Sequence, residues 1–205
     1  MSMYEQIVNA WKRRDEIPEL KKVWRERLLK WRGEPATLRL ERPTRLDRAR
    51  ALGYVPKPGV FVVRQRVGAG PHKRPDWSGG RKSKNMRRTK ILQKNYRAIA
   101  EERAARMFKN CEVINSYFVA KDGHDYWFEV ILVDRTSPAV LSDKRLSWLA
   151  NPANRGRAFR GLTSAGKVYR GLRWKGKGSE KARPSRRANA SRKLKENNKQ
   201  RVKEK

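Results

Sequence analysis

The sequence contains a single cysteine, Cys111, and only two histidines among its 205 residues. One cysteine cannot form an intramolecular disulfide, so the fold does not depend on cross-links. Cys111 stands just before the apolar run that starts at Val113, where we expect a partly buried, unreactive thiol. His72 and His124 each lack a cysteine or a second histidine at the spacing of metal ligands. We therefore expect no metal site and no other cofactor.

Long apolar runs are also missing. No stretch of about 20 apolar residues occurs, and the N-terminus lacks the apolar core of a signal peptide. The basic segments have no strong apolar face of the kind that lies on a membrane surface. We expect a soluble, cytoplasmic protein without membrane contact.

Acidic residues are scarce, which matters both for catalysis and for charge. The 20 acids are scattered or lie on predicted helix faces, and no catalytic constellation stands out, so we expect neither an enzyme nor a small-molecule substrate. The 53 Lys and Arg residues give a net charge of +33. Residues 155–205 alone hold nineteen basic residues against three glutamates. Only a polyanion would give such a segment a defined path, and nucleic acid is the first candidate.

The hydrophobic pattern predicts an α+β fold, with a small antiparallel β-sheet flanked by helices, a long basic loop and an extended C-terminal tail. We divide the chain into an N-terminal helical extension (1–35), an α+β core (36–150) and a basic Gly/Arg/Lys-rich tail (151–205). Within the core, residues 111–149 carry four basic and six acidic residues. This interval should form the self-sufficient hydrophobic centre, while the basic segments around it face the partner.

The spacing of apolar residues predicts where the individual helices and strands lie. Helices are expected at 4–13 and from Pro18 to about Gly33, the second with Leu20, Trp24, Leu28 and Trp31 in one core-facing stripe. Further helices are predicted near 42–53, 91–109 and 142–150. Strands are predicted at 37–41, 60–67, 113–120 and 126–133, the last two joined by a tight turn at Asp122-Gly123.

For one strand and one helix, the sequence also predicts which side chains are buried and which are exposed. The strand at 60–67 should bury Phe61, Val63 and Val67 on one face and expose a basic end on the other. The helix at 91–109 should turn Tyr96, Ile99, Ala104, Met107 and Phe108 inward and Glu101, Glu102, Arg103 and Arg106 outward. Residues 68–90 are too polar to pack and are predicted to form a long basic loop; loops of this length inside a compact domain are usually functional or disordered. In the last predicted helix, Leu146 with Trp148 or Leu149 should close the core.

Residues 161–167, Gly-Leu-Thr-Ser-Ala-Gly-Lys, fit most of a phosphate-cradling loop of nucleotide hydrolases. However, Val168 stands where a Ser or Thr should hold magnesium, and the preceding residues are too polar for a buried strand. A hydrolase is therefore the weakest hypothesis. A Gly-flanked turn with free backbone N–H groups and Lys167 could instead bind an RNA phosphate.

Folded RNA is the polyanion that the pattern favours. No helix-turn-helix, zinc finger or basic zipper is visible, and the aromatic motifs of single-strand RNA binders are missing. Four separate basic segments, one with glycine interleaved among the basic residues, indicate phosphate contacts to a large RNA with several packed helices. The candidate RNA-binding residues are Arg42, Arg45, Arg48, Arg50, Arg64, Arg66, Lys73, Arg74, Arg81, Lys82, Lys84, Arg87, Arg88, Arg155, Arg157, Arg160, Lys167, Arg170, Arg173, Lys175, Lys177, Lys181, Arg183, Arg186 and Arg187.

Five segments carry a family resemblance: 42–54 (RPTRLDRARALGY), 100–104 (AEERA), 113–117 (VINSY), 127–134 (WFEVILVD) and 160–166 (RGLTSAG). In this order they resemble the archaeal and eukaryotic fifteen-e family of large-subunit ribosomal proteins, and the ending at 171–189 looks like its archaeal branch. The resemblance implies a structural protein of the large subunit, with an antiparallel sheet flanked by helices and extensions in ribosomal RNA. It implies no catalytic role.

The resulting expectation is a structural constituent of the large ribosomal subunit that binds and stabilises folded ribosomal RNA, next to neighbouring ribosomal proteins and without forming a homo-oligomer. The alternative from another class is a non-ribosomal protein that compacts RNA or DNA. Such a protein would use the same charge but would need no glycine-interleaved tail.

Overall fold

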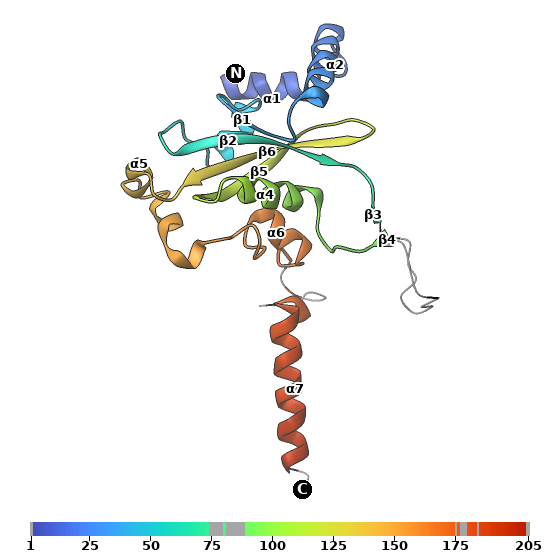
Figure 1. The fold of residues 1–205 in the computed structure, drawn as a ribbon, viewed down its shortest axis with the longest axis vertical. Helices are drawn as coiled ribbons and strands as arrows, with labels where there is room; N and C mark the ends of the chain where they lie inside the picture. Colours follow the sequence, from blue (N-terminus) through green and yellow to red (C-terminus); the bar gives the residue numbers. More distant parts are fainter. Residues whose placement is uncertain are drawn as a thin grey trace.

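A computed structural model of the chain describes residues 2–73, 80, 89–174, 176, 180–183 and 185–203. At its centre lies a four-stranded antiparallel sheet in the order β1-β2-β6-β5 (Figure 1). The strands are β1 (Thr37–Leu40), β2 (Val60–Gly68), β5 (Cys111–Lys121) and β6 (Asp125–Asp134). The predicted α+β class with an antiparallel sheet flanked by helices is confirmed.

Helices cover both faces of this sheet. Figure 1 shows α1 (Met3–Lys12) and α2 (Pro18–Gly33) on one side of the sheet, and α4 (Tyr96–Met107) and α6 (Ser164–Tyr169) on the other. The short helix α3 (Leu46–Ala51) packs with the first pair, and α5 (Pro138–Leu141) lies at one end of the sheet. Helix α7 (Arg186–Lys203) points away from the body.

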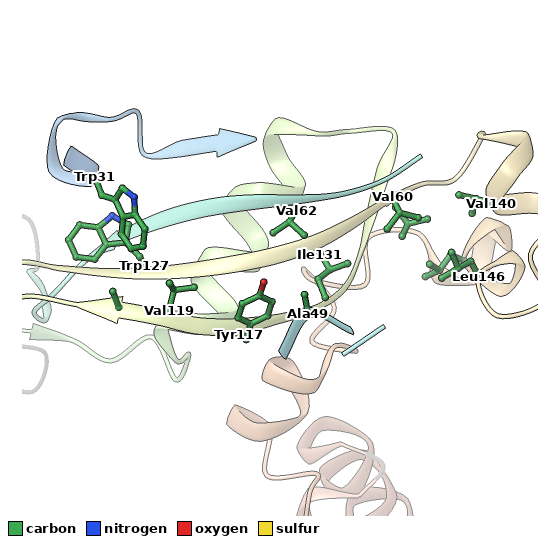
Figure 2. Packing of buried hydrophobic residues seen from close by; sticks show 13 residues of the cluster. Trp31, Ala49, Val60, Val62, Tyr117, Val119, Trp127, Ile131, Val140 and Leu146 are labelled. Carbon is green, nitrogen blue, oxygen red and sulfur yellow. The ribbon is translucent and has the colours of Figure 1, made fainter. Parts of the chain in front are cut away.

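The first core is built around Trp31, the buried tryptophan of the α2 stripe. Trp31 is 6% exposed and lies beside Trp127 of β6 (Figure 2). The centroids of the two rings are 6.0 Å apart. Trp24 and Leu28 pack against the same cluster, so the core-facing stripe is confirmed for these three residues. Trp24 meets Trp11 of α1 at 4.8 Å, edge to face. Trp24 also meets Trp31 at 5.7 Å, so a chain of four tryptophans anchors α1 and α2 to the sheet.

The second core lies under α4, and it corrects the prediction for that helix. The helix begins at Tyr96, five residues later than expected, because the Asn95 side chain accepts the N–H of Ala98 and caps it. Small residues face the sheet, including Ala100 and Ala104, so the helix approaches closely. The predicted orientation was wrong for two side chains. Met107, expected to face inward, is 68% exposed, and Glu101, expected to face outward, is 1% exposed.

Strand β2 also differs from its prediction. The expected face is buried, but the opposite face is buried as well, because β2 lies between β1 and β6 under α2. Arg64, expected at an exposed basic end, is 7% exposed. It forms an ion pair with Glu34, and its guanidinium lies 4.3 Å from the ring centre of Trp31. An inner strand of a sheet covered on both sides has no solvent face.

The described ends of the predicted loop 68–90 form a ribbon. Strands β3 (His72–Lys73) and β4 (Thr89–Lys90) pair antiparallel, and the Tyr96 hydroxyl donates to the carbonyl of Gly70 at 3.2 Å. Residues 74–79 and 81–88 lie outside the described part.

The region 142–150 does not form the single helix that was predicted. The short helix α5 precedes it, and Ser147–Ala150 forms a 3₁₀ helix (η2). Leu146 and Leu149 close the core there, while Trp148 remains 42% exposed.

Residues 155–170, which the sequence assigned to the extended tail, lie against the body. Ala158 joins the second core, and the Asn95 side chain donates to the carbonyl of Ala165 at 3.2 Å. Small residues at these positions allow the close approach, which composition alone did not reveal.

Replacing the central tryptophan tests the first core. Trp31→Ala should lower the free energy of unfolding by about 3–5 kcal/mol, because it empties a buried site between α2 and β6. Leu29→Ala, in the same helix but 57% exposed, is the matched control and should change little. Urea unfolding of the free protein gives both values, and equal losses would contradict this picture of the core.

Candidate nucleic-acid interface

Two arginines cap the exposed edge of the sheet. Strand β5 forms that edge, so one side of its backbone has no neighbouring strand. Arg157 donates to the carbonyl of Val113 at 3.0 Å. Arg97 donates to the carbonyl and the hydroxyl of Ser116 and to the Asn115 side chain. These guanidinium groups satisfy edge carbonyls that another chain could otherwise pair with.

A buried carboxylate lies beneath the arginines. Glu101 of α4 accepts hydrogen bonds from the hydroxyls of Ser116 in β5 and Thr163 before α6. Burial raises its pKa, while these hydrogen bonds and the charges of Arg97 and Arg157 oppose the rise. Glu101 thus joins three segments and supplies the negative charge that holds the two arginines at the edge.

Further arginines from distant segments gather around Arg97. Burial lowers the pKa of Arg97; Glu101 opposes this, and repulsion from Arg173 and Arg48 adds to it. Burial likewise lowers the pKa of Arg157, Glu112 and Glu101 oppose this, and Arg160 adds to it. We call this set of five, Arg48, Arg97, Arg157, Arg160 and Arg173, the basic edge. It unites α3, α4 and the segment 155–173.

The segment that carries Arg48 is fixed by a second buried carboxylate. Glu129 of β6 accepts the backbone N–H of Thr44 at 3.1 Å and the hydroxyl of Tyr117. It is fully buried, and burial raises its pKa against the effect of these hydrogen bonds. The backbone just before α3 is therefore attached to the centre of the sheet.

The structure places the predicted RNA-binding residues in three kinds of environment. Nine are exposed: Arg42, Arg48, Arg50, Lys73, Arg155, Arg160, Lys167, Arg173 and Arg187. Five are partly buried: Arg45, Arg66, Arg157, Arg170 and Arg183. Arg64 is buried. Arg74, Arg81, Lys82, Lys84, Arg87, Arg88, Lys175 and Lys177 lie outside the described residues, as do the side chains of Lys181 and Arg186.

Some of these arginines are used inside the protein. Arg45 forms an ion pair with Asp47 at 2.9 Å and stacks over Trp11 at 4.3 Å. Arg45, a candidate RNA-binding residue, is thus already paired with an acid of its own segment. Arg170 donates to the carbonyls of Arg160 and Gly161, and Arg183 donates to those of Leu172 and Trp174. Sequence alone could not separate these groups from the exposed ones.

The turn at 161–167 has an internal role. The N–H groups of Gly161, Leu162 and Lys167 donate to backbone carbonyls, and that of Gly166 donates to the Thr163 hydroxyl at 3.1 Å. A Cβ on Gly166 would lie 2.5 Å from the backbone of Gly161, which itself has φ +64°. These N–H groups were expected to be free for a phosphate, and they are not. The glycines are needed because two backbone segments of the protein touch.

Arg97 was not among the residues predicted from sequence. It lies on a helix one turn before Glu101, which reads as an ordinary helical ion pair. Only the pairing of α4 with the edge strand shows its part in the basic edge.

No cluster of three or more His, Cys, Asp or Glu side chains suited to a metal occurs among the described residues. Burial raises the pKa of Cys111 to about 11, so its thiol stays protonated at neutral pH, as expected. None of the helices in the described ranges is long and apolar enough to cross a membrane.

An antiparallel sheet with an arginine-rich edge and a basic C-terminal segment defines a basic α+β protein with a surface suited to a polyanion. The chain matches the family described as Ribosomal L15 over residues 2–189. It is 48% identical over 192 residues to the large ribosomal subunit protein eL15 of Methanospirillum hungatei, covering 93% of this chain and 97% of the relative. Identity to the eL15 protein of Picrophilus torridus is 49% over 190 residues, covering 92% and 97%. This protein belongs to the Ribosomal L15 family, which confirms the resemblance.

Replacing Gly166 tests the internal role of the turn. Gly166→Ala should push the turn away from Gly161 and speed amide hydrogen exchange in residues 161–170 of the free protein. Gly33→Ala is the control, because a Cβ there meets nothing within 4 Å. Unchanged exchange in Gly166→Ala would contradict the steric argument.

The buried Glu129 gives a pH dependence with a defined sign. A carboxyl group with a raised pKa binds a proton more readily in the folded state, so it lowers the free energy of unfolding as pH rises above its ordinary value of 4.5. Relative to Glu129→Gln, the wild type should therefore lose stability as the pH rises above about 4.5.

Urea unfolding across that range checks this expectation. The exposed Glu26→Gln is the control and should follow the wild type at every pH. If Glu129→Gln also follows the wild type, the buried group does not titrate as described.

Proposed function

We propose that this protein, as a constituent of the large ribosomal subunit, binds and stabilises folded ribosomal RNA through the basic edge and the basic C-terminal segment. Family membership supports the ribosomal assignment and makes ribosomal RNA and other ribosomal proteins its partners. It favours this role over compaction of nucleic acid outside the ribosome, and it places the protein in the cytoplasmic ribosome.

The observation that carries the proposal is the convergence of unneutralised arginines from separate segments on one edge of the sheet. Arg48, Arg160 and Arg173 are exposed, and none of them forms an ion pair within the described residues. The positive charges of these arginines repel one another until phosphates of the RNA neutralise them. Counterions released from the RNA then favour binding.

The rigid body gives these charges fixed spacing. Glu101 holds Arg97 and Arg157 at the edge, and Glu129 fixes the backbone before α3. Phosphate contacts at fixed positions select the shape of a folded RNA, whereas a flexible basic tail selects only its charge. The remaining predicted residues, from the ribbon to α7, would extend the contact surface.

Salt dependence tests the proposal. The full chain should bind in vitro transcribed large-subunit ribosomal RNA of M. hungatei with steeply falling affinity as salt rises. If eight phosphates are neutralised, the log–log slope should be about −6 to −7. In the double variant Arg48→Gln/Arg160→Gln the slope should become shallower by about 1.4–1.8, from about 0.7–0.9 per phosphate.

A charge-matched control separates specific contacts from total charge. Lys22→Gln/Lys30→Gln removes two exposed charges from α2, outside the proposed surface, and should leave the slope nearly unchanged. A wild-type slope near zero in the filter-binding titration would refute electrostatic RNA binding. Equal changes in both double variants would refute the assignment to the basic edge.

A further inference from the structure

A pocket of about 490 Å³ lies beside the basic edge, at a position that sequence reasoning assigned to the protein's own core. It is bounded by Tyr54 and Pro56 after α3, by Ile114 of β5 and by Trp148 of η2. Its size falls in the range of about 300–1,000 Å³ that is usual for pockets that hold ligands. Its walls are mainly apolar and aromatic.

Trp148 is held in place as a platform. Its ring nitrogen donates to the carbonyl of Arg145 at 2.9 Å, and its own carbonyl accepts from the Asn154 side chain at 2.6 Å. The guanidinium of Arg157 lies 4.5 Å from the ring centre. Trp148 lines the pocket, and Arg157 does not. Trp148 is 42% exposed, and its hydrogen bonds hold the indole in a fixed position at the pocket.

The charged residues that line the pocket are both arginines. Arg50 and Arg145 are exposed, and neither forms an ion pair in the described part of the chain. Asp143, next to this rim, is already paired with Lys57 at 2.6 Å. The pocket therefore combines an apolar interior with a positive rim.

We propose that this pocket receives a single unpaired nucleobase of ribosomal RNA. The base stacks on Trp148, and the phosphates on either side of it lie on Arg50 and Arg145. A nucleobase has a π-face that can stack on the indole, and it is linked to two phosphates that can pair with the arginines. It therefore fits both the apolar interior and the positive rim of the pocket. An apolar side chain from another protein would fill the interior but leave the rim unneutralised.

Continuity with the basic edge supports this occupant. Arg157 stacks on Trp148 and also caps Val113 of β5, and the next residue, Ile114, lines the pocket. A strand of RNA that follows the basic edge would thus arrive at the pocket. The inference rests on the proposed function, since it names one contact of the same RNA.

The test uses the full chain and the same ribosomal RNA transcript. Trp148→Leu keeps an apolar residue but removes the stacking ring, and its affinity should fall about tenfold with an unchanged salt slope. Trp148→Phe should recover most of this loss. Dimethyl sulfate probing of the bound RNA should show altered reactivity at one or a few bases in Trp148→Leu compared with the wild type. Leu141→Ala, an exposed apolar residue outside the pocket, is the control.

The outcomes separate the pocket from the proposed function. If the wild type does not bind the RNA, both proposals fail. If Trp148→Leu is folded by thermal melting and binds with wild-type affinity and an unchanged footprint, the pocket holds no base while RNA binding stands. If it binds RNA normally but enters large subunits poorly, the occupant is a neighbouring protein and the nucleobase assignment is overturned.

Discussion

The buried carboxylate of Glu101 is the interaction on which the basic surface depends. It connects α4, the edge strand β5 and the segment before α6 through the hydroxyls of Ser116 and Thr163. Its charge also offsets the cost of placing Arg97 and Arg157 half-buried against the sheet. Without it, Arg97 would lose the carboxylate whose charge opposes the cost of its burial, Arg157 would keep Glu112 as its compensating charge, and the segment 155–173 would lose one of its attachments to the body.

A chain with a net charge of +33 must distribute its arginines between folding and binding. This protein uses some of them as structural donors: Arg64 and Arg45 stack on tryptophans and pair with acids, and Arg170 and Arg183 satisfy backbone carbonyls. Arginine suits this double use because its planar guanidinium stacks and donates several hydrogen bonds while remaining charged. Arg48 remains exposed, and Arg160 is exposed although it also donates to the carbonyls of Ala153 and Arg155, so their charges face solvent.

The edge of the sheet and the pocket beside it form one continuous surface in the proposed binding mode. Exposed edge strands tend to pair with other chains, and here the arginines that prevent such pairing also supply positive charge. In the proposed function, the side chains that protect the edge would also attract the RNA. In this binding mode the pocket would add a stacking contact on Trp148, which depends on shape and not on charge, beside the phosphate contacts of Arg50 and Arg145.

Much of the fold was predictable because it follows from local pattern. The period of Trp24, Leu28 and Trp31, the alternation in β5 and β6 and the Asp122-Gly123 turn determined those elements, and the matched motifs determined the family. The surplus of basic residues determined the class of partner to expect. These properties depend on residues close together in the chain, so sequence alone decided them.

Only the tertiary structure decided which charged groups are buried. Glu101 was expected outside and Arg64 at an exposed end, yet both lie inside because a second layer covers each of them. Gly161 and Gly166 were read as an RNA-facing turn, but they touch each other. Leu146 with Trp148 or Leu149 was expected to close the core; Leu146 and Leu149 do so, whereas Trp148 lines a pocket. In each case the environment of the side chain is set by segments that are distant in sequence. The local pattern of residues does not predict these contacts.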